Sequence, residues 1–117
     1  FWGSWCGPCI RNAPKLVAIS DNYSSKLFDK DSKLEILSFA LEKKGKKWKK
    51  VVNKFGFNWE LQVVQFHQLV LNSPIANKYG VFEIPSKFLI DPNGNVVLSK
   101  TSFSEIEQYL EKRLIKG

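Results

Sequence analysis

The sequence predicts an α/β protein with a mixed central β-sheet flanked by helices. Three observations lead to this prediction. A nearly continuous apolar run at residues 34–41 is typical of a parallel strand that is covered on both faces. Two short apolar runs, at residues 87–91 and 95–99, flank the turn sequence Pro92-Asn93-Gly94 and predict an antiparallel hairpin. Segments with helical spacing of apolar residues lie before, between and after these runs.

Length and composition indicate one domain, residues 1–117, in an ordinary globular protein. The 18 basic and 11 acidic residues give a net charge of +7, which favours anionic partners without defining an activity. No apolar run reaches the length of a membrane span, and no signal peptide is visible. Because the chain has no methionine and begins at the end of an expected strand, we expect it to belong to a longer, exported or membrane-tethered protein.

The first half of the chain predicts two helices around the apolar strand. Apolar residues recur at helical spacing over residues 9–23, and Pro14 is expected to kink this helix. Residues 43–55 predict a second helix, with Trp48, one of two valines and Phe55 on its buried side. Six lysines lie between residues 43 and 50. A solvated helix face explains them better than an anionic docking patch.

The second half begins with residues 57–72, an aromatic and glutamine-rich stretch to which the pattern assigns no element. Ser73 followed by proline predicts the start of a short helix that ends near Tyr79. After the hairpin, Ser102 and Glu105 have the spacing of a capping box and predict the start of the last helix.

Cys6 and Cys9 are the only obvious reactive groups, and they stand two residues apart where the first helix begins. Free N–H groups and the helix dipole favour a thiolate at Cys6, whose pKa in such motifs falls from about 8.5 to roughly 3.5–7.5. A thiolate attacks disulfides, whereas a thiol hardly does. We therefore predict that Cys6 is the nucleophile and Cys9 the resolving thiol. Pro8 lies in the first turn, where its missing N–H costs little.

The pentapeptide Trp5-Cys6-Gly7-Pro8-Cys9 resembles the active site of thioredoxin-like thiol–disulfide oxidoreductases. Three further stretches are similar to the ResA/TlpA branch of that superfamily, whose members are usually tethered or exported cell-envelope proteins. They are Phe1-Trp2-Gly3-Ser4, Tyr79-Gly80-Val81 and Ile84-Pro85-Ser86-Lys87-Phe88-Leu89-Ile90-Asp91-Pro92-Asn93-Gly94. The resemblance covers nearly the whole chain and implies a thioredoxin-like fold.

In that fold the strand leading into the cysteines is central, and here only Phe1 and Trp2 could belong to it. The amino-terminal strand is thus missing or truncated in this sequence. The sheet has fewer strands, another chain supplies the edge, or upstream residues complete it.

The resemblance also implies roles around the cysteines. Pro85 is expected in the cis form beside them, with the backbone of Ile84 offered to an incoming peptide. The alternative is a trans proline that starts an edge strand. Trp5 is expected to shield Cys6 and to present a flat surface to the substrate, and Gly7 and Pro8 to tune the reduction potential.

One departure from the branch concerns proton transfer. A glutamate commonly follows the second cysteine by three residues, and this chain has Asn12 there. An amide cannot relay a proton, so help for Cys9 has to come from another group. Glu42 is a candidate, although a surface glutamate is the favoured interpretation. His67, the single histidine, is interpreted as an ordinary surface or half-buried residue.

The sequence therefore predicts a thiol–disulfide oxidoreductase that exchanges protein disulfides through Cys6 and Cys9, in the reductive direction. We expect no bound cofactor, no metal and no nucleic acid. The expected location is the periplasm or the outer face of a bacterial cell envelope, with a redox partner that recharges the thiols and roles in redox homeostasis or cytochrome c maturation. Two alternatives stay open: a metal-binding module, which would lack ligands within one chain, and a redox-inactive interaction domain.

Overall fold

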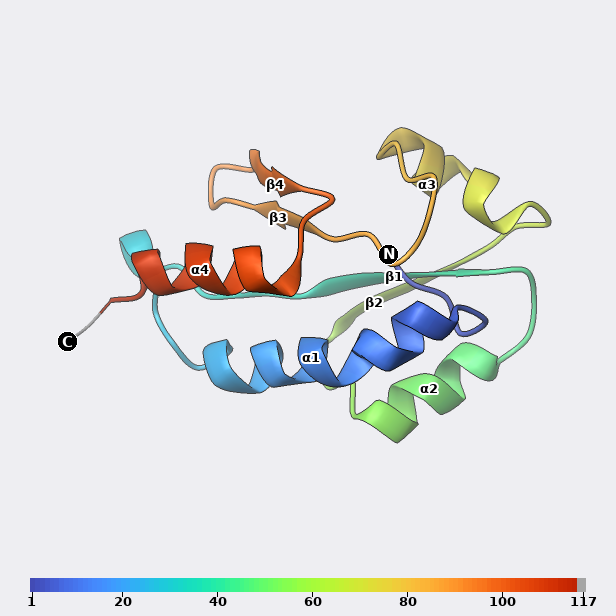
Figure 1. Cartoon of the computed structure of the whole chain (residues 1–117), viewed down its shortest axis with the longest axis horizontal. Coiled ribbons are helices and arrows are strands. Elements are labelled where there is room, and N and C mark those ends of the chain that lie inside the picture. The colour runs from blue at the N-terminus through green and yellow to red at the C-terminus, as the bar shows by residue number, and fades with distance from the viewer. Residues whose placement is uncertain (116–117) are drawn as a thin grey trace. The chain divides into compact units, whose positions relative to one another are not determined.

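Helix α1 (Gly7–Tyr23) begins directly after Cys6 in the computed structural model, which describes residues 1–115 (Figure 1). The helix predicted for residues 9–23 is confirmed, and it starts two residues earlier. The helix continues through Pro14. Pro8 lies in its first turn, where a missing N–H leaves no hydrogen bond unmade.

Two compact units divide the chain, and the boundary falls inside α1, immediately after Pro14. The first unit comprises Phe1–Pro14 and Ile36–Ser86, and the second comprises Lys15–Glu35 and the chain from Lys87 onward. All the residues predicted for the active site belong to the first unit.

The first unit is built on a parallel strand pair. Strand β1 (Leu37–Glu42) pairs with β2 (Leu61–Phe66) in a register that sets Leu37 opposite Leu61 and Glu42 opposite Phe66. Helix α2 (Lys47–Phe55) connects the two strands, as a parallel pair requires. The apolar run therefore contains the predicted strand. The helix predicted for residues 43–55 is confirmed from Lys47 to Phe55, and Lys43, Lys44 and Lys46 lie before its start.

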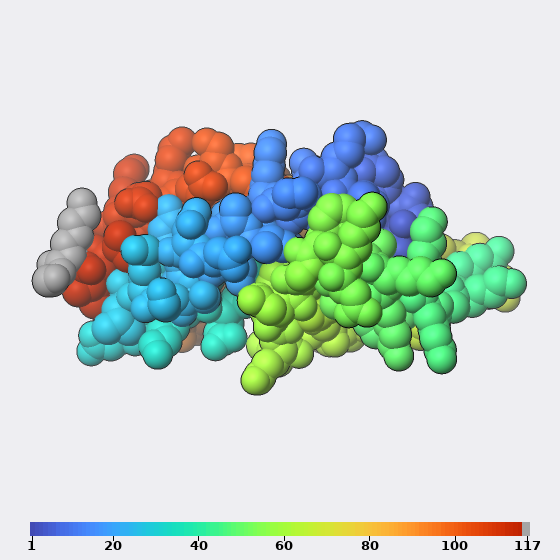
Figure 2. Space-filling view, turned by 90° about the horizontal axis from the view of Figure 1, so that it is seen from below, coloured from blue at the N-terminus to red at the C-terminus, as the bar shows by residue number. Residues whose placement is uncertain are grey.

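The lysines between residues 43 and 50 are exposed both on α2 and in the segment before it, so those on the helix agree with a solvated face. Figure 2 shows the α2 segment, in green, at the surface, and all six lysines between residues 43 and 50 are exposed. The predicted buried stripe is only half-buried at Trp48 and Phe55, and none of the residues of α2 is fully buried.

Strand β2 lies in the stretch where the sequence pattern assigns no element. Its apolar residues Leu61, Val63 and Phe66 are each more than 40% exposed, and Gln62 and Gln65 interrupt them. The strand thus has neither the continuous apolar run nor the clean alternation that identifies a strand from sequence.

Phe1 and Trp2 hold the position expected for the central strand. The Trp2 N–H donates to the Phe39 carbonyl at 2.9 Å, and the Leu41 N–H donates to the Trp2 carbonyl at 2.8 Å. On the other side, the Phe1 amino group donates to the Ser86 carbonyl at 2.9 Å, and the Ser86 N–H donates to the Phe1 carbonyl at 3.2 Å. Within the described residues, these two residues pair on both sides as a short strand would.

The rest of the first unit comprises two short helical segments. The 3₁₀ turn η2 (Val70–Asn72) precedes helix α3 (Pro74–Lys78), which confirms the predicted short helix. Ser73 is its N-cap, but its side chain makes no capping hydrogen bond: the hydroxyl is buried and has no hydrogen-bond partner among residues 1–115.

The second unit contains the hairpin and the last helix. Strand β3 (Phe88–Ile90) pairs antiparallel with β4 (Val96–Ser99), as predicted. A 3₁₀ turn, η1 (Asp29–Asp31), follows α1, and α4 (Phe103–Arg113) begins at the predicted capping box of Ser102 and Glu105. The apolar core of this unit contains Ile19, Tyr23, Phe28, Ile106 and Leu110.

Hydrogen bonds join the named strands as two separate pairs, one parallel and one antiparallel. Both kinds of pairing in the predicted mixed arrangement are therefore present in the described part of the chain. None of the helices between residues 1 and 115 has the length and apolar character needed to cross a bilayer.

Candidate active site

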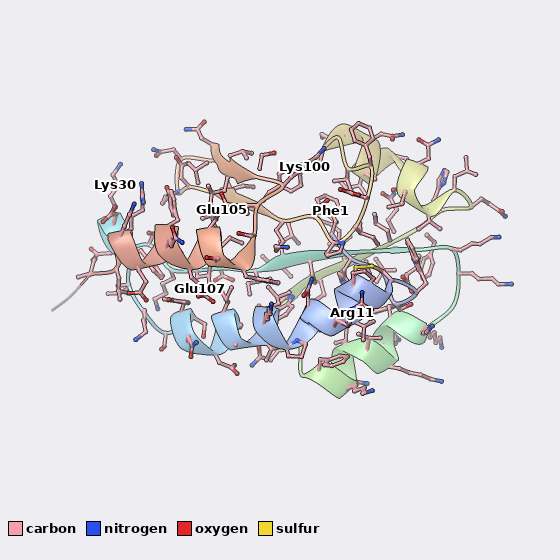
Figure 3. The ribbon with its side chains drawn as sticks, in the orientation of Figure 1. Phe1, Arg11, Lys30, Lys100, Glu105 and Glu107 are labelled. Carbon is pink, nitrogen blue, oxygen red and sulfur yellow. A yellow bond between two sulfur atoms is a disulfide. The ribbon has the colours of Figure 1, made fainter. Side chains whose placement is uncertain are left out.

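Cys6 and Cys9 form a disulfide at the start of α1, where Figure 3 shows its yellow bond. Their Cα atoms are 5.3 Å apart. The backbone N–H of Cys9 points at the Cys6 sulfur, at 3.3 Å, as a free N–H of a first helical turn can. Once the disulfide is reduced, this N–H and the helix dipole stabilise a thiolate on Cys6. The exposed fractions are 5% for Cys6 and 6% for Cys9, so the sulfurs meet solvent only over a small area.

The turn that leads into Cys6 is fixed by its neighbours. The Cys6 N–H donates to the Gly3 carbonyl at 3.1 Å and closes the turn. The Trp5 indole N–H donates to the Leu41 carbonyl at 2.8 Å, while 47% of the Trp5 side chain stays exposed. A Cβ atom on Gly3 would lie 2.6 Å from the indole nitrogen and 3.1 Å from Ile84 Cδ1. Glycine at position 3 therefore allows the indole to lie against the turn.

The segment around Ile84 reaches Cys6 from far along the sequence. The Ile84 carbonyl oxygen lies 3.6 Å from the Cys6 sulfur, and the Ile84–Pro85 peptide bond is cis. Ser86 fixes this segment, because its hydroxyl donates to the Glu83 carbonyl at 2.7 Å and its backbone pairs with Phe1. The structure thus brings the predicted residues Ile84 and Pro85 to the cysteine pair.

The other predicted residues lie along the first turns of α1. Gly7 and Pro8 are its first two residues, and both are exposed beside the disulfide. Asn12 lies further along the same helix and is half-buried.

The interpretation of Glu42 as a surface residue is wrong. Glu42 is only 2% exposed, and its carboxyl group accepts two hydrogen bonds from Ser4. The backbone N–H of Ser4 donates to Oε2 at 2.9 Å, and the Ser4 hydroxyl donates to Oε1. Ser4 belongs to a stretch that carries the family resemblance, but the sequence analysis assigns it no role. The available signal is the place of Glu42 at the carboxyl end of a buried parallel strand, where functional groups of α/β proteins gather.

His67 belongs to a local turn, as expected for an ordinary histidine. It is half-buried, and its Nδ1 accepts a hydrogen bond from the Leu69 N–H at 3.0 Å. Among residues 1–115 there is no group of three or more His, Cys, Asp or Glu side chains placed to hold a metal ion.

The family model described as Thioredoxin-like matches residues 1–96. The chain belongs to this family. ResA of Bacillus anthracis, a thiol-disulfide oxidoreductase, is 27% identical over 115 residues, which cover 96% of this chain and 60% of the relative. ResA of Geobacillus thermodenitrificans is 32% identical over 114 residues, which cover 95% of this chain and 59% of the relative. The predicted similarity to the ResA branch is confirmed, and the chain spans about three-fifths of the length of these relatives.

A solved structure confirms the fold. The thiol-disulfide oxidoreductase from Bacteroides fragilis matches with a TM-score of 0.79 and 23% identity, over 96% of this chain and 76% of that one. At this identity the match establishes the thioredoxin-like arrangement of helices and strands, and the chemistry is argued from the cysteine site itself.

Proposed function

We propose that this chain catalyses thiol–disulfide exchange with protein substrates, preferentially reducing their disulfides. The observation that carries the proposal is the Cys6–Cys9 disulfide at the start of α1, with the Ile84 carbonyl 3.6 Å from the Cys6 sulfur. The names of the similar ResA proteins support the same reaction.

The reaction balances with the two cysteines alone. The Cys6 thiolate attacks one sulfur of a substrate disulfide, a Cys6–substrate bond forms, and the other substrate sulfur leaves with the electron pair as a thiolate. The Cys9 thiolate then attacks the Cys6 sulfur and releases the second substrate thiolate. The substrate gains two electrons and, after protonation, two protons, and the protein ends as the Cys6–Cys9 disulfide. No bound cofactor takes part in this scheme.

Substrate contacts are assigned to the groups that surround Cys6. The exposed face of Trp5 offers an apolar surface, and the backbone of Ile84, followed by Pro85, offers peptide groups to an extended substrate segment. Gly7 and Pro8 lie between the two cysteines, where they tune the reduction potential. These roles follow from position and from the family resemblance.

The proposed setting is the periplasm or outer face of a bacterial cell envelope. It rests on the similarity to ResA, and it includes a redox partner that returns the dithiol to its reduced form. Maturation of c-type cytochromes is the proposed process for such a reductant. We further propose that residues 1–117 act as one thioredoxin-like domain of a longer protein.

Single-cysteine variants test the exchange reaction. Because Cys6 makes the first bond, Cys6→Ser is expected to abolish insulin-disulfide reduction. Because Cys9 resolves the intermediate, Cys9→Ser is expected to accumulate a mixed disulfide that mass spectrometry detects. Near-wild-type turnover in both variants would discard the mechanism and favour a redox-inactive binding module.

The direction of exchange is decided by the reduction potential of the cysteine pair. Thioredoxin-like proteins range from about −270 mV for reductants to about −120 mV for oxidants. Equilibration with glutathione is expected to give a value toward the reducing end. A value close to the oxidising end would reverse the proposed direction while leaving the exchange chemistry intact.

A further inference from the structure

We propose that Glu42 is a positioning residue for Cys6, acting through Ser4 on the turn that precedes the disulfide. The inference rests on the proposed function, because it takes Cys6 to be the reacting sulfur. It assigns a role to two buried residues, Ser4 and Glu42, that take no part in the exchange steps themselves.

The contact between Glu42 and Ser4 is buried and uses both carboxyl oxygens. The Ser4 N–H donates to Oε2 at 2.9 Å and the Ser4 hydroxyl donates to Oε1, with exposed fractions of 2% for Glu42 and 5% for Ser4. A buried carboxyl group is costly unless its oxygens are hydrogen-bonded. Ser4 supplies both of the donors described for this side chain, so a movement of Ser4 breaks both bonds together.

Ser4 occupies the middle of the turn that ends at Cys6. The Cys6 N–H closes this turn on the Gly3 carbonyl at 3.1 Å, so Ser4 and Trp5 form its corner. Each corner residue is tied to the end of β1: Ser4 to Glu42, and the Trp5 indole to the Leu41 carbonyl at 2.8 Å. Two adjacent residues of one strand therefore fix the corner from which the chain enters the active site.

The end of β1 is itself a firm anchor. Glu42 pairs with Phe66 in the parallel sheet, and its carbonyl accepts from the His67 N–H at 2.9 Å. The Leu41 N–H donates to the Trp2 carbonyl at 2.8 Å. A reactive group is held most accurately when a regular element of secondary structure supports the residues behind it. The Glu42–Ser4 contact gives Cys6 such support.

The orientation of the carboxyl group favours positioning over proton transfer. Its two oxygens face Ser4, and no contact of Glu42 with either cysteine sulfur is among those described for residues 1–115. Glu42 thus acts on Cys6 through the turn. The contact fixes the position of the Cys6 sulfur, which lies 3.6 Å from the Ile84 carbonyl oxygen and 3.3 Å from the Cys9 backbone nitrogen.

Two serine variants separate positioning from a general loss of stability. Ser4 and Ser38 are both 5% exposed, both lie in the first unit, and each makes one side-chain hydrogen bond with its hydroxyl. The Ser4 hydroxyl binds Glu42, whereas the Ser38 hydroxyl accepts from the Trp59 indole N–H at 3.1 Å. Ser4→Ala and Ser38→Ala therefore remove comparable buried bonds, one supporting the active-site turn and one remote from it in sequence.

The measurement is the rate at which iodoacetamide alkylates reduced Cys6 in a Cys9→Ser background, at about pH 7, where the thiolate is the reacting form. Ser4→Ala is expected to slow alkylation about tenfold, because misplacement of a reacting group weakens the interactions that activate it. Ser38→Ala is expected to leave the rate unchanged. Equal alkylation rates in the two variants would overturn the proposal. This holds whatever stability thermal unfolding shows for each variant.

Glutamate variants decide whether shape or charge matters. Glu42→Gln removes the charge but keeps the length of the side chain and one acceptor oxygen for the Ser4 N–H, while its new NH2 group can donate to the Ser4 hydroxyl. Glu42→Ala removes the contact. We expect alkylation at the wild-type rate for Glu42→Gln and about tenfold slower for Glu42→Ala. Equal slowing in both would assign the effect to charge or proton transfer and overturn positioning. Glu60→Gln is the control, since Glu60 is exposed in the same unit.

The experiment stays decisive if Glu42→Ala does not fold, because Ser4→Ala tests the contact and Glu42→Gln tests the charge. A failure of this proposal can also be distinguished from a failure of the proposed function. Should the wild-type chain fail to reduce insulin, the function fails. The alkylation rates still show whether Ser4 and Glu42 set the reactivity of Cys6.

Discussion

The residues next to the cysteines and the apolar cluster of the second unit are stabilised by different kinds of contact. In the first unit, directional hydrogen bonds fix the residues next to the cysteines: Ser4 to Glu42, and Trp5 to the Leu41 carbonyl. In the second unit, an apolar cluster that includes Ile106 and Leu110 packs α4 and the end of α1 together. Apolar packing stabilises without strict direction, whereas hydrogen bonds weaken steeply when misaligned. We therefore expect stability and thiol reactivity to depend on separate residues, and mutations can test this.

The largest expected effect on stability is in the second unit. Leu110 is 6% exposed in the apolar cluster, so Leu110→Ala is expected to lower the free energy of unfolding by about 2–5 kcal/mol. Urea unfolding measures this loss, and Cys6 alkylation in the folded variant is expected to match the wild type. Lys112→Ala, on the exposed side of the same helix, is the control. Slower alkylation of Cys6 in the folded Leu110→Ala protein would contradict this separation of stability from thiol reactivity.

A smaller change in stability is expected from Gly3→Ala, together with a change in reactivity. The added Cβ would lie 2.6 Å from the Trp5 indole nitrogen and 2.8 Å from its Cε2, so the indole has to move and its bond to Leu41 is lost. Overpacking of this kind costs about 1–3 kcal/mol. Urea unfolding and the alkylation rate of Cys6 measure the two effects.

Gly56→Ala is the matched control for that variant. Gly56 lies in the same unit and caps α2 at φ +71°, and a Cβ there would meet no atom within 4 Å. The control is expected to lose roughly 1 kcal/mol through backbone strain alone. If Cys6 in Gly3→Ala is alkylated at the wild-type rate, Trp5 does not support Cys6.

The smallest effect concerns Tyr23, whose hydroxyl donates to Glu111 at 2.6 Å in the second unit. This hydrogen bond, and then burial, raise the pKa of Tyr23 to about 12. Because the pKa in the folded state lies above the ordinary value of about 10, the contribution to stability is complete below that value. It disappears as the pH rises through the folded pKa.

Tyr23→Phe is expected to lower the free energy of unfolding by about 0.5–1.5 kcal/mol at neutral pH. The wild type is then expected to lose this advantage between about pH 10 and pH 12. Urea unfolding of both proteins across this range measures the difference. A constant gap between them at all pH values would show that the Tyr23–Glu111 bond does not depend on the proton of the hydroxyl.

The local elements of the fold could be predicted because their signals are local. The helical spacing before Tyr23, the capping box at Ser102 and the turn at Pro92-Asn93-Gly94 each lie within a few residues of the structure they specify. Strand β2 could not be predicted, because pairing with β1 defines it and each of its residues except Val64 is polar or exposed. Ser73 is the N-cap residue that the sequence predicts, but its hydroxyl does not make the capping hydrogen bond.

In the candidate site, too, the local feature could be predicted from the sequence pattern and the long-range contacts could not. The spacing of Cys6 and Cys9 by itself indicates a redox or metal-binding pair, whereas Ile84 contacts Cys6 across 78 residues and was identified only through the family resemblance. The burial of Glu42 depends on Ser4, 38 residues earlier in the chain. A contact of this range leaves no periodic pattern in the sequence.

The pairing of Phe1 with Ser86 bears on how the amino end can be labelled. The Phe1 nitrogen donates a hydrogen bond to the Ser86 carbonyl at 2.9 Å. An ordinary peptide nitrogen keeps one hydrogen for that carbonyl, so a fluorophore linker or affinity tag joined there leaves this bond possible. A tertiary amide at this nitrogen has no hydrogen to donate, so a linkage that produces one is the wrong choice for a reporter at this position.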